Sequence, residues 1–201
     1  MTSASPGPGL SREPGCRYSQ PQLQMEPEFE IRPATRAEAP VLAQTVLFGF
    51  ETYRAFAPPG WEPPPMTGEH ARIVERLRLP DAWCRIAVSA GEPAGHVGIL
   101  AAREHAADDS PIQDRRPIPG RGYLWMLFVR EPWWGSGLAT RLHSLSIEEA
   151  AARGYEEMRL VTPAGQRRSR AFYEREGWST DGIETFEPML GLDLVTYIRP
   201  V

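Results

Sequence analysis

A run of seven consecutive apolar residues, Tyr123 to Val129, constrains the fold of this chain more than any other feature. Such a run is typical of a strand that is covered on both faces. Pro132 ends the run, Gly135 and Gly137 follow, and a helical pattern begins at Leu138. A covered strand that leads through a glycine turn into a helix predicts a layered α/β domain.

Strand and helix patterns alternate on both sides of this segment. We expect strands at 29–32, 83–89, 96–102, 123–129, 158–161 and 192–198, and helices at 35–53, 68–79, 138–153 and 166–175. Thr35 and Glu38 have the spacing of a capping box, Glu92 and Pro93 are expected to form a hairpin turn, and residues 103–121 a loop. The sequence thus predicts one domain over residues 28–201, of α/β (α+β) type, on a mixed, mostly antiparallel sheet.

Residues 1–27 carry five prolines and almost no large aliphatic side chains. A segment of this composition cannot bury enough surface to offset its ordering entropy, so we expect a disordered, proline-rich tail. Cys16 lies in this tail and Cys84 in a strand, which argues against a disulfide and for a reducing compartment. With a net charge of −4 and no long apolar run, we expect a cytoplasmic protein that binds neither nucleic acid nor membrane.

All 22 basic residues are arginine, and the chain contains no lysine and no asparagine. A Walker-type phosphate loop needs a lysine, and so does a Schiff-base or pyridoxal-phosphate mechanism. Those classes of function are therefore excluded. We also expect no metal site.

The glycine turn before Leu138 is the main candidate for a binding site. Backbone N–H groups at a helix N-terminus favour a phosphate, and glycines allow it to approach closely. A dinucleotide fingerprint would need a third glycine at Thr140 and an acid at the end of the next strand, whereas Glu156 and Glu157 precede that strand. A coenzyme A pyrophosphate fits better, although a purely structural turn stays an alternative.

The stretch from Tyr123 to Trp178 resembles the GNAT superfamily of N-acetyltransferases. The matching pieces are the buried strand ending in L-F-V at 127–129, W-G-S-G-L-A at 134–139, the amphipathic helix that follows, and F-Y-E-R-E-G-W at 172–178. Family sequences usually have Arg or Gln, x, x, Gly, x, Gly or Ala in this loop, and Trp134 takes the first of these positions here. Gln166 stands where the family commonly has asparagine.

The resemblance implies that acetyl-coenzyme A binds between two splayed strands of the sheet, at about 123–129 and 158–161. The residues implied to bind it are Leu127, Phe128, Val129, Trp134, Gly135, Ser136, Gly137, Leu138, Ala139, Thr140 and Gln166. A backbone N–H of Leu127 or Phe128 would stabilise the oxyanion. Tyr173 would be the general acid that protonates the leaving thiolate.

The expected activity is transfer of an acetyl group from acetyl-coenzyme A to an amine of a small molecule or peptide, by direct attack. The alternative is a non-catalytic module that binds or senses acyl-coenzyme A, because the central strand carries no acid. Candidates for the general base are Glu51, His70, Glu104, His105, Glu184 and Glu187. Candidates for phosphate contacts are Arg130, Arg141, Arg167, Arg168 and Arg170. By family habit, the resemblance also allows a homodimer.

Overall fold

The computed structural model of the chain describes Met1 and residues 28–104 and 111–201. All but Met1 of the predicted disordered tail, and His105, lie outside these residues. The strands are β1 (Glu30–Pro33), β2 (Trp83–Ser89), β3 (Glu92–Arg103), β4 (Pro117–Val129), β5 (Glu157–Pro163), β6 (Glu184–Glu187) and β7 (Leu192–Pro200). The α-helices are α1 (Ala39–Glu51), α2 (Met66–Leu77), α3 (Leu138–Ala152) and α4 (Arg167–Arg175). Short 3-10 helices are η1 (Arg36–Glu38), η2 (Thr52–Ala55), η3 (Ile112–Asp114) and η4 (Glu131–Trp133).

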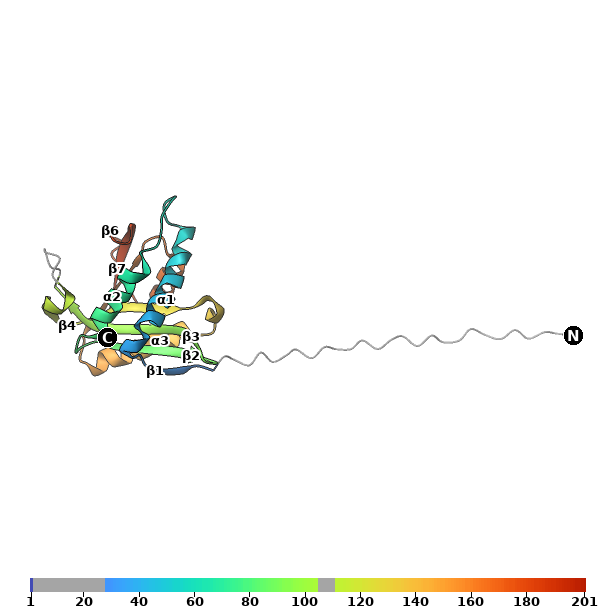
Figure 1. The fold of residues 1–201 in the computed structure, drawn as a ribbon, viewed down its shortest axis with the longest axis horizontal. Coiled ribbons are helices and arrows are strands. Elements are labelled where there is room, and N and C mark those ends of the chain that lie inside the picture. Colours follow the sequence, from blue (N-terminus) through green and yellow to red (C-terminus); the bar gives the residue numbers. More distant parts are fainter. Residues whose placement is uncertain (2–27, 105–110) are drawn as a thin grey trace.

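The strands form one sheet of seven in the order β1-β2-β3-β4-β5-β7-β6. Only β4 and β5 pair in parallel, and every other neighbouring pair is antiparallel. The predicted mixed, mostly antiparallel sheet is therefore confirmed. Helices α1 and α2 lie above the sheet in Figure 1, and α3 lies below it.

Two hydrophobic cores fill the space between these layers. The first joins α3 and α4 to the sheet, with Leu138, Leu142 and Tyr173 among its members. The second joins α1 and α2 to the sheet through residues such as Leu42 and Ile73. Since β4 contributes side chains to both cores, the expectation of a strand covered on both faces is confirmed.

A β-bulge in β4 sets which of its side chains meets which core. The pairing with β3 shifts between Gly98 opposite Met126 and Ile99 opposite Leu124, which leaves Trp125 as the extra residue. Trp125 and Met126 consequently face the same core, although they are adjacent in the strand. The bulge turns the Trp125 ring toward α2, and the ring fills the space that a side chain at Gly98 would occupy.

Strands β4 and β5 separate after a short parallel contact. Their paired residues are Arg121 with Glu157, Gly122 with Met158 and Tyr123 with Arg159, and no pair follows. Among the described residues, the rest of β4 therefore has no strand on its β5 side. The splay implied by the family resemblance is present here.

Three local features differ from the sequence prediction. The hairpin turn is formed by Ala90 and Gly91, both with positive φ (51° and 83°), and Glu92 already belongs to β3. A two-residue turn with positive φ at both positions matches the right-handed twist of the flanking strands. The chain therefore turns at Ala90 and Gly91 rather than at the predicted Glu92 and Pro93. Strand β4 begins at Pro117, inside the predicted loop, where Pro117 pairs with Arg103 of β3. Strand β6 was not predicted, because its four residues are mostly exposed and have no apolar alternation.

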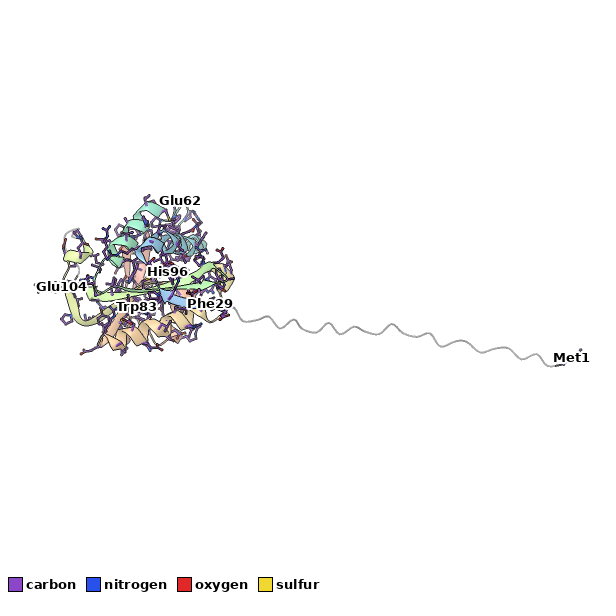
Figure 2. The ribbon with its side chains drawn as sticks, turned by 60° about the horizontal axis from the view of Figure 1, so that its bottom comes forward. Met1, Phe29, Glu62, Trp83, His96 and Glu104 are labelled. Atoms are coloured by element: carbon purple, nitrogen blue, oxygen red, sulfur yellow. The ribbon has the colours of Figure 1, made fainter. Side chains whose placement is uncertain are left out.

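The ends of the helices agree better with the sequence. The Thr35–Glu38 capping box is present, although it starts η1 rather than α1. Gly154 follows α3 with φ 74°, as expected for a helix stop. Figure 2 shows His96 well inside the molecule, whereas Glu62 of the proline-rich segment lies at its outer edge. In the described residues, no helix combines the length and apolar character needed to cross a membrane.

Candidate active site

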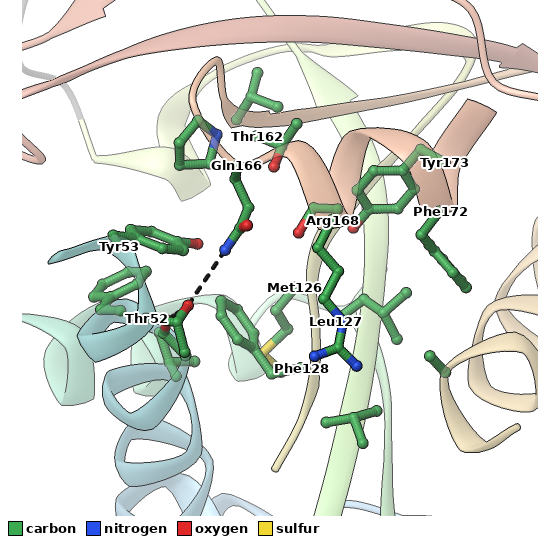
Figure 3. A pocket seen from close by; sticks show the side chains of 18 of the residues that line it. Thr52, Tyr53, Met126, Leu127, Phe128, Thr162, Gln166, Arg168, Phe172 and Tyr173 are labelled. Carbon is green, nitrogen blue, oxygen red and sulfur yellow. Dashed lines mark hydrogen bonds between the residues drawn. The ribbon is translucent and has the colours of Figure 1, made fainter. Parts of the chain in front are cut away.

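A cavity of about 750 Å³ lies along β4 where β4 and β5 separate. Its walls come from α1 and α2 on one side and from β5, α3 and α4 on the other. Figure 3 shows Thr52 and Tyr53 facing Phe172 and Tyr173 across this space, with Met126, Leu127 and Phe128 of β4 between them. The cavity thus brings together segments that are far apart in the sequence.

The backbone of β4 presents alternate residues to this cavity. Arg130 N–H donates to Ala94 O of β3 at 2.9 Å. Because backbone groups alternate in direction along a strand, Phe128 also faces β3, and Leu127 and Val129 face the splay. Of the two predicted oxyanion donors, Leu127 N–H therefore points toward the cavity and Phe128 N–H points away from it.

The glycine turn after β4 forms an open cradle of N–H groups. Gly135 and Gly137 have φ of 82° and 79°, and nothing lies within 4 Å of where a Cβ would stand. Gly137 is the N-cap of α3, and Leu138, Ala139 and Thr140 begin the helix beside the cavity. Among the described residues, the N–H groups of Gly135, Gly137, Ala139 and Thr140 donate to no protein acceptor. These residues fit a phosphate group, which needs free donors and no side chain in front of them.

Ser136 differs from its neighbours because its side chain holds the loop itself. Its hydroxyl donates to Trp133 O at 2.7 Å and accepts from Leu138 N–H at 3.4 Å. Ser136 does not line the cavity, unlike the other loop residues predicted to bind the cofactor. Its predicted contact with the cofactor has no support from the cavity lining.

Trp134 is half exposed and anchored to the end of β4. Its Nε1–H donates to Val129 O at 2.7 Å, so this carbonyl already has one partner. The Arg168 guanidinium lies over the indole, with Cζ at 3.7 Å from the ring centroid. A cation from α4 therefore stands at the loop position where family sequences usually carry Arg or Gln.

Tyr173 lies on α4, and its ring packs against Phe172, Trp178 and Tyr197. Only 7% of the residue is exposed, yet it lines the cavity. Burial, together with the nearby hydroxyls of Tyr53 and Tyr123, raises the pKa of Tyr173 above its usual value of 10. The hydroxyl is therefore fully protonated at neutral pH and available as a donor.

Gln166 links the two walls of the cavity at the start of α4. Its Nε2 donates to Thr52 Oγ1 at 3.2 Å, the dashed line in Figure 3. Thr52 Oγ1 in turn donates to Gly49 O at 2.6 Å. Gly49 is required there because the Phe128 ring of β4 lies where its Cβ would be, at 2.4 Å. The amide of Gln166 thus fixes the spacing between α1 and α4.

The α2 end of the cavity is charged and was not predicted from the sequence. Glu69, Arg72 and Arg76 recur at intervals of three and four, so they share one helix face, and all three line the cavity. Glu69 is 6% exposed and forms an ion pair with Arg72. A buried acid at helical spacing from two arginines is the signal that could have identified this group.

Among the predicted general bases that the structure describes, one lies at this cavity. Glu187 at the end of β6 lines it, whereas Glu51, His70, Glu104 and Glu184 do not. Glu51 is instead exposed and pairs with Arg54 at 2.6 Å. Within the described part of the chain, the acids of the cavity wall are Glu69 and Glu187.

The remaining candidates serve the fold or face solvent. Arg130 donates to Thr45 Oγ1, Arg170 donates to Tyr197 Oη, and Arg141 and Arg167 are exposed. His96 and His143 are buried. Cys84 is buried and free, and burial raises its pKa to about 12.

Comparison with known proteins places this site in a family. The model of the Acetyltransferase (GNAT) family matches residues 48–178, well over half of the chain. N-alpha-acetyltransferase 30 of Schizosaccharomyces pombe is 36% identical over 58 residues, which are 29% of this chain and 39% of that protein. The chain thus matches about two fifths of the length of this relative.

Solved structures share the fold at low sequence identity. A ribosomal-protein-alanine N-acetyltransferase from Brucella melitensis superimposes with a TM-score of 0.63 and 20% identity, covering 86% of this chain and 99% of its own. The PaiA N-acetyltransferase from Thermoplasma acidophilum, solved with coenzyme A, gives 0.62 and 14%, covering 87% and 99%. With the family match over residues 48–178, the splayed strands and the glycine cradle, this chain belongs to the GNAT family of acetyltransferases.

Proposed function

We propose that this protein transfers an acetyl group from acetyl-coenzyme A to an amine. The observation that carries the proposal is one cavity that joins the glycine cradle at Gly135–Thr140, the free edge of β4 at Leu127, and the Tyr173 hydroxyl. Acyl transfer from coenzyme A needs three things that these groups can supply. The cradle offers a phosphate site, Leu127 N–H offers a donor to the negative charge that develops on oxygen, and Tyr173 offers an acid for the leaving group. The names of the relatives, which include N-acetyltransferases and a coenzyme A complex, support the same activity.

Acetyl-coenzyme A supplies the reactive thioester and is a co-substrate. The cradle N–H groups would hold its pyrophosphate at the N-terminus of α3, and Leu127 N–H would face the acetyl oxygen. Arg168 is the cation nearest in sequence to Gln166 that lines the cavity, and it would add charge beside the cradle. The open β4 edge would pair with the pantetheine amides, as a strand would.

In the proposed step, the acceptor nitrogen forms a bond to the acetyl carbon while the carbon–sulfur bond breaks. Leu127 N–H donates to the oxygen as negative charge develops there, and Tyr173 donates its proton to the departing sulfur. The proton lost from nitrogen passes to Glu69 or Glu187, the two acids of the cavity wall, and from there to solvent. The products are an N-acetylated amine and the free thiol of coenzyme A.

The direct experiment incubates the full chain with acetyl-coenzyme A and a panel of amines while thiol release is measured. Thiol release with stoichiometric N-acetylation supports the proposal. Binding of acetyl-coenzyme A without turnover of any amine would favour the non-catalytic sensing module instead. Absence of binding would contradict both functions.

Tyr173→Phe tests the proposed acid. The variant keeps the aromatic packing against Trp178 and Tyr197 but loses the donor, so we expect kcat to fall about 100-fold or more. The dissociation constant of acetyl-coenzyme A, measured by calorimetry, should stay within about twofold. An unchanged kcat would remove Tyr173 from the mechanism.

A further inference from the structure

Arg76 is a cation without an anion at the α2 end of the cavity, which would receive the amine in the proposed function and is called the acceptor end below. It lies in the last turn of α2 and is half-buried, and its Cζ is 5.3 Å from the centroid of the Trp125 ring. Among the described residues it forms no ion pair with any carboxylate. An arginine held over an aromatic ring with its guanidinium unpaired is preorganised to bind an anion.

The other cavity arginines already have partners or belong to the opposite end. Arg72 pairs with Glu69, and Arg175 lies 3.6 Å from Glu176. Arg168 covers Trp134 beside the glycine cradle. Of the arginines that line the described cavity, Arg76 is therefore the one at the acceptor end that is free to bind an anion.

The acids at this end do not neutralise Arg76. Glu187 Oε1 accepts from Met189 N–H at 3.1 Å and makes no ion pair with Arg76. Glu69 uses Oε2 for Arg72, and its Oε1 has no hydrogen-bond partner among the described residues. One wall of the acceptor end thus offers a free guanidinium and a carboxylate oxygen with spare capacity.

Trp125, the residue that Arg76 contacts, relates Arg76 to the reacting centre on β4. Trp125, whose ring Arg76 covers, precedes Leu127 by two residues on β4. The guanidinium that covers the Trp125 ring therefore belongs to the same cavity, and lies beside the same segment of β4, as the Leu127 N–H that would face the acetyl group. Glu69, two helical turns earlier on the same face of α2, would attract the ammonium of the incoming acceptor.

We propose that the preferred acceptor is an amine that also carries a carboxylate, such as an amino acid, with the carboxylate bound by Arg76. This inference rests on the proposed function and adds the substrate class. The planar fork of the guanidinium can bind both carboxylate oxygens, which a neutral group cannot reproduce. An acceptor without an anion leaves the Arg76 guanidinium without an anionic partner.

The first experiment compares each amino acid with its own amide on the full-length protein. The pair shares the side chain and the amine, so the ratio of kcat/KM for acid over amide isolates the carboxylate. We expect a ratio of at least about tenfold, the effect of one good charged hydrogen-bonded contact. A series with one to four methylenes between amine and carboxylate measures the span, and peptides test whether an acidic N-terminal side chain can supply the anion.

The second experiment asks whether Arg76 causes this selectivity. Arg76→Met keeps an apolar stem over Trp125 but removes the charge, and we expect the acid-to-amide ratio to approach one. Arg78→Met is the matched control, because Arg78 is exposed and does not line the cavity, and it should keep the ratio of the unmodified protein. Acetyl-coenzyme A affinity and circular dichroism establish that both variants are folded.

The outcomes separate the two proposals. Thiol release with equal rates for acids and amides would contradict the substrate class and leave the acetyltransferase function intact. A preference for acids that survives in Arg76→Met would remove Arg76 from the assignment. No thiol release with any amine would contradict the proposed function itself. The comparison of acids with amides needs no variant, so it stays decisive even if Arg76→Met fails to fold.

Discussion

The two ends of the cavity are built from different parts of the chain. At the cofactor end, backbone groups of a β4 edge and a glycine turn present free N–H donors. At the proposed acceptor end, the surface consists of side chains from α2, β4 and β6, including Glu69, Arg76, Trp125 and Glu187. The cofactor end depends on backbone conformation. The acceptor end depends on which side chains the fold brings together.

This difference explains why the proposed cofactor end is easier to predict from the sequence than the proposed acceptor end. A backbone cradle needs glycines at fixed spacing between a strand and a helix, so it leaves a local pattern. A wall of side chains can come from elements far apart in the chain, and Glu69 and Glu187 are separated by more than a hundred residues. Variation in such a wall changes the acceptor without disturbing the fold.

The largest effect is expected where the cofactor end depends on conformation. Gly137→Val forces a β-branched residue into φ 79° and places a side chain in front of the cradle N–H groups. We expect the dissociation constant of acetyl-coenzyme A, measured by calorimetry, to rise at least about 100-fold, because several charged hydrogen bonds are lost together.

Gly154→Val is the matched control for that substitution. Gly154 also has positive φ (74°) and open space around it, but it lies at the other end of α3, away from the cavity. Both variants should lose a similar free energy of unfolding, about 1–2 kcal/mol, and only Gly137→Val should lose the cofactor. Equal affinity in the two variants would show that the turn is structural.

The sequence predicted the fold, and it singled out the glycine turn as a candidate site, because both rest on local patterns. The apolar run at 123–129 indicated a covered strand, and the residue order from Trp134 to Thr140 indicated a phosphate turn. The bulge at Trp125 has no such pattern, since it is set by pairing with β3 and by the space above Gly98. The spacing of Glu69, Arg72 and Arg76 could place these side chains on one helix face, but it could not show that the bulge directs Trp125 toward Arg76.

The candidates for the general base show the same limit of prediction from the sequence. His70 was predicted, but its neighbour Glu69 is the residue that α2 directs into the cavity. The helix phase that decides between them depends on how α2 packs through Ile73 into the second core. Neighbouring residues on an α-helix point about 100° apart. Glu69 therefore lines the cavity while the adjacent His70 does not.

A smaller effect tests whether the cofactor end also uses a side chain. Arg168 stands over Trp134, where the family usually has a polar or charged loop residue. We expect Arg168→Gln to raise the dissociation constant of acetyl-coenzyme A by about tenfold and to weaken its dependence on salt, because one charged contact is lost. Arg167→Gln, at an exposed neighbour outside the cavity, is the control and should bind normally. Identical affinities would mean that the cradle is made by the backbone alone.

The smallest effect concerns two buried histidines, one on each side of β4. His96 packs against Phe128, with ring centroids 5.8 Å apart. His143 accepts a hydrogen bond from Trp178 Nε1 at 2.8 Å, beneath α4. Burial, with a smaller contribution from Arg130, lowers the pKa of His96 to about 3, and burial lowers the pKa of His143 to about 4. Both are therefore neutral in the folded protein near pH 7.

Because both folded pKa values lie below the unfolded value of 6.5, the unfolded chain binds more protons as the pH falls. The stabilisation is complete above pH 6.5 and is lost as the pH falls toward 4 for His143 and toward 3 for His96. We expect the free energy of unfolding in urea to fall by about 1 kcal/mol per histidine for each pH unit below 6.5. His143→Gln, which keeps an acceptor for Trp178, and His96→Leu should each remove about half of this slope. A slope that disappears with one substitution alone would show that only that side of β4 excludes the proton.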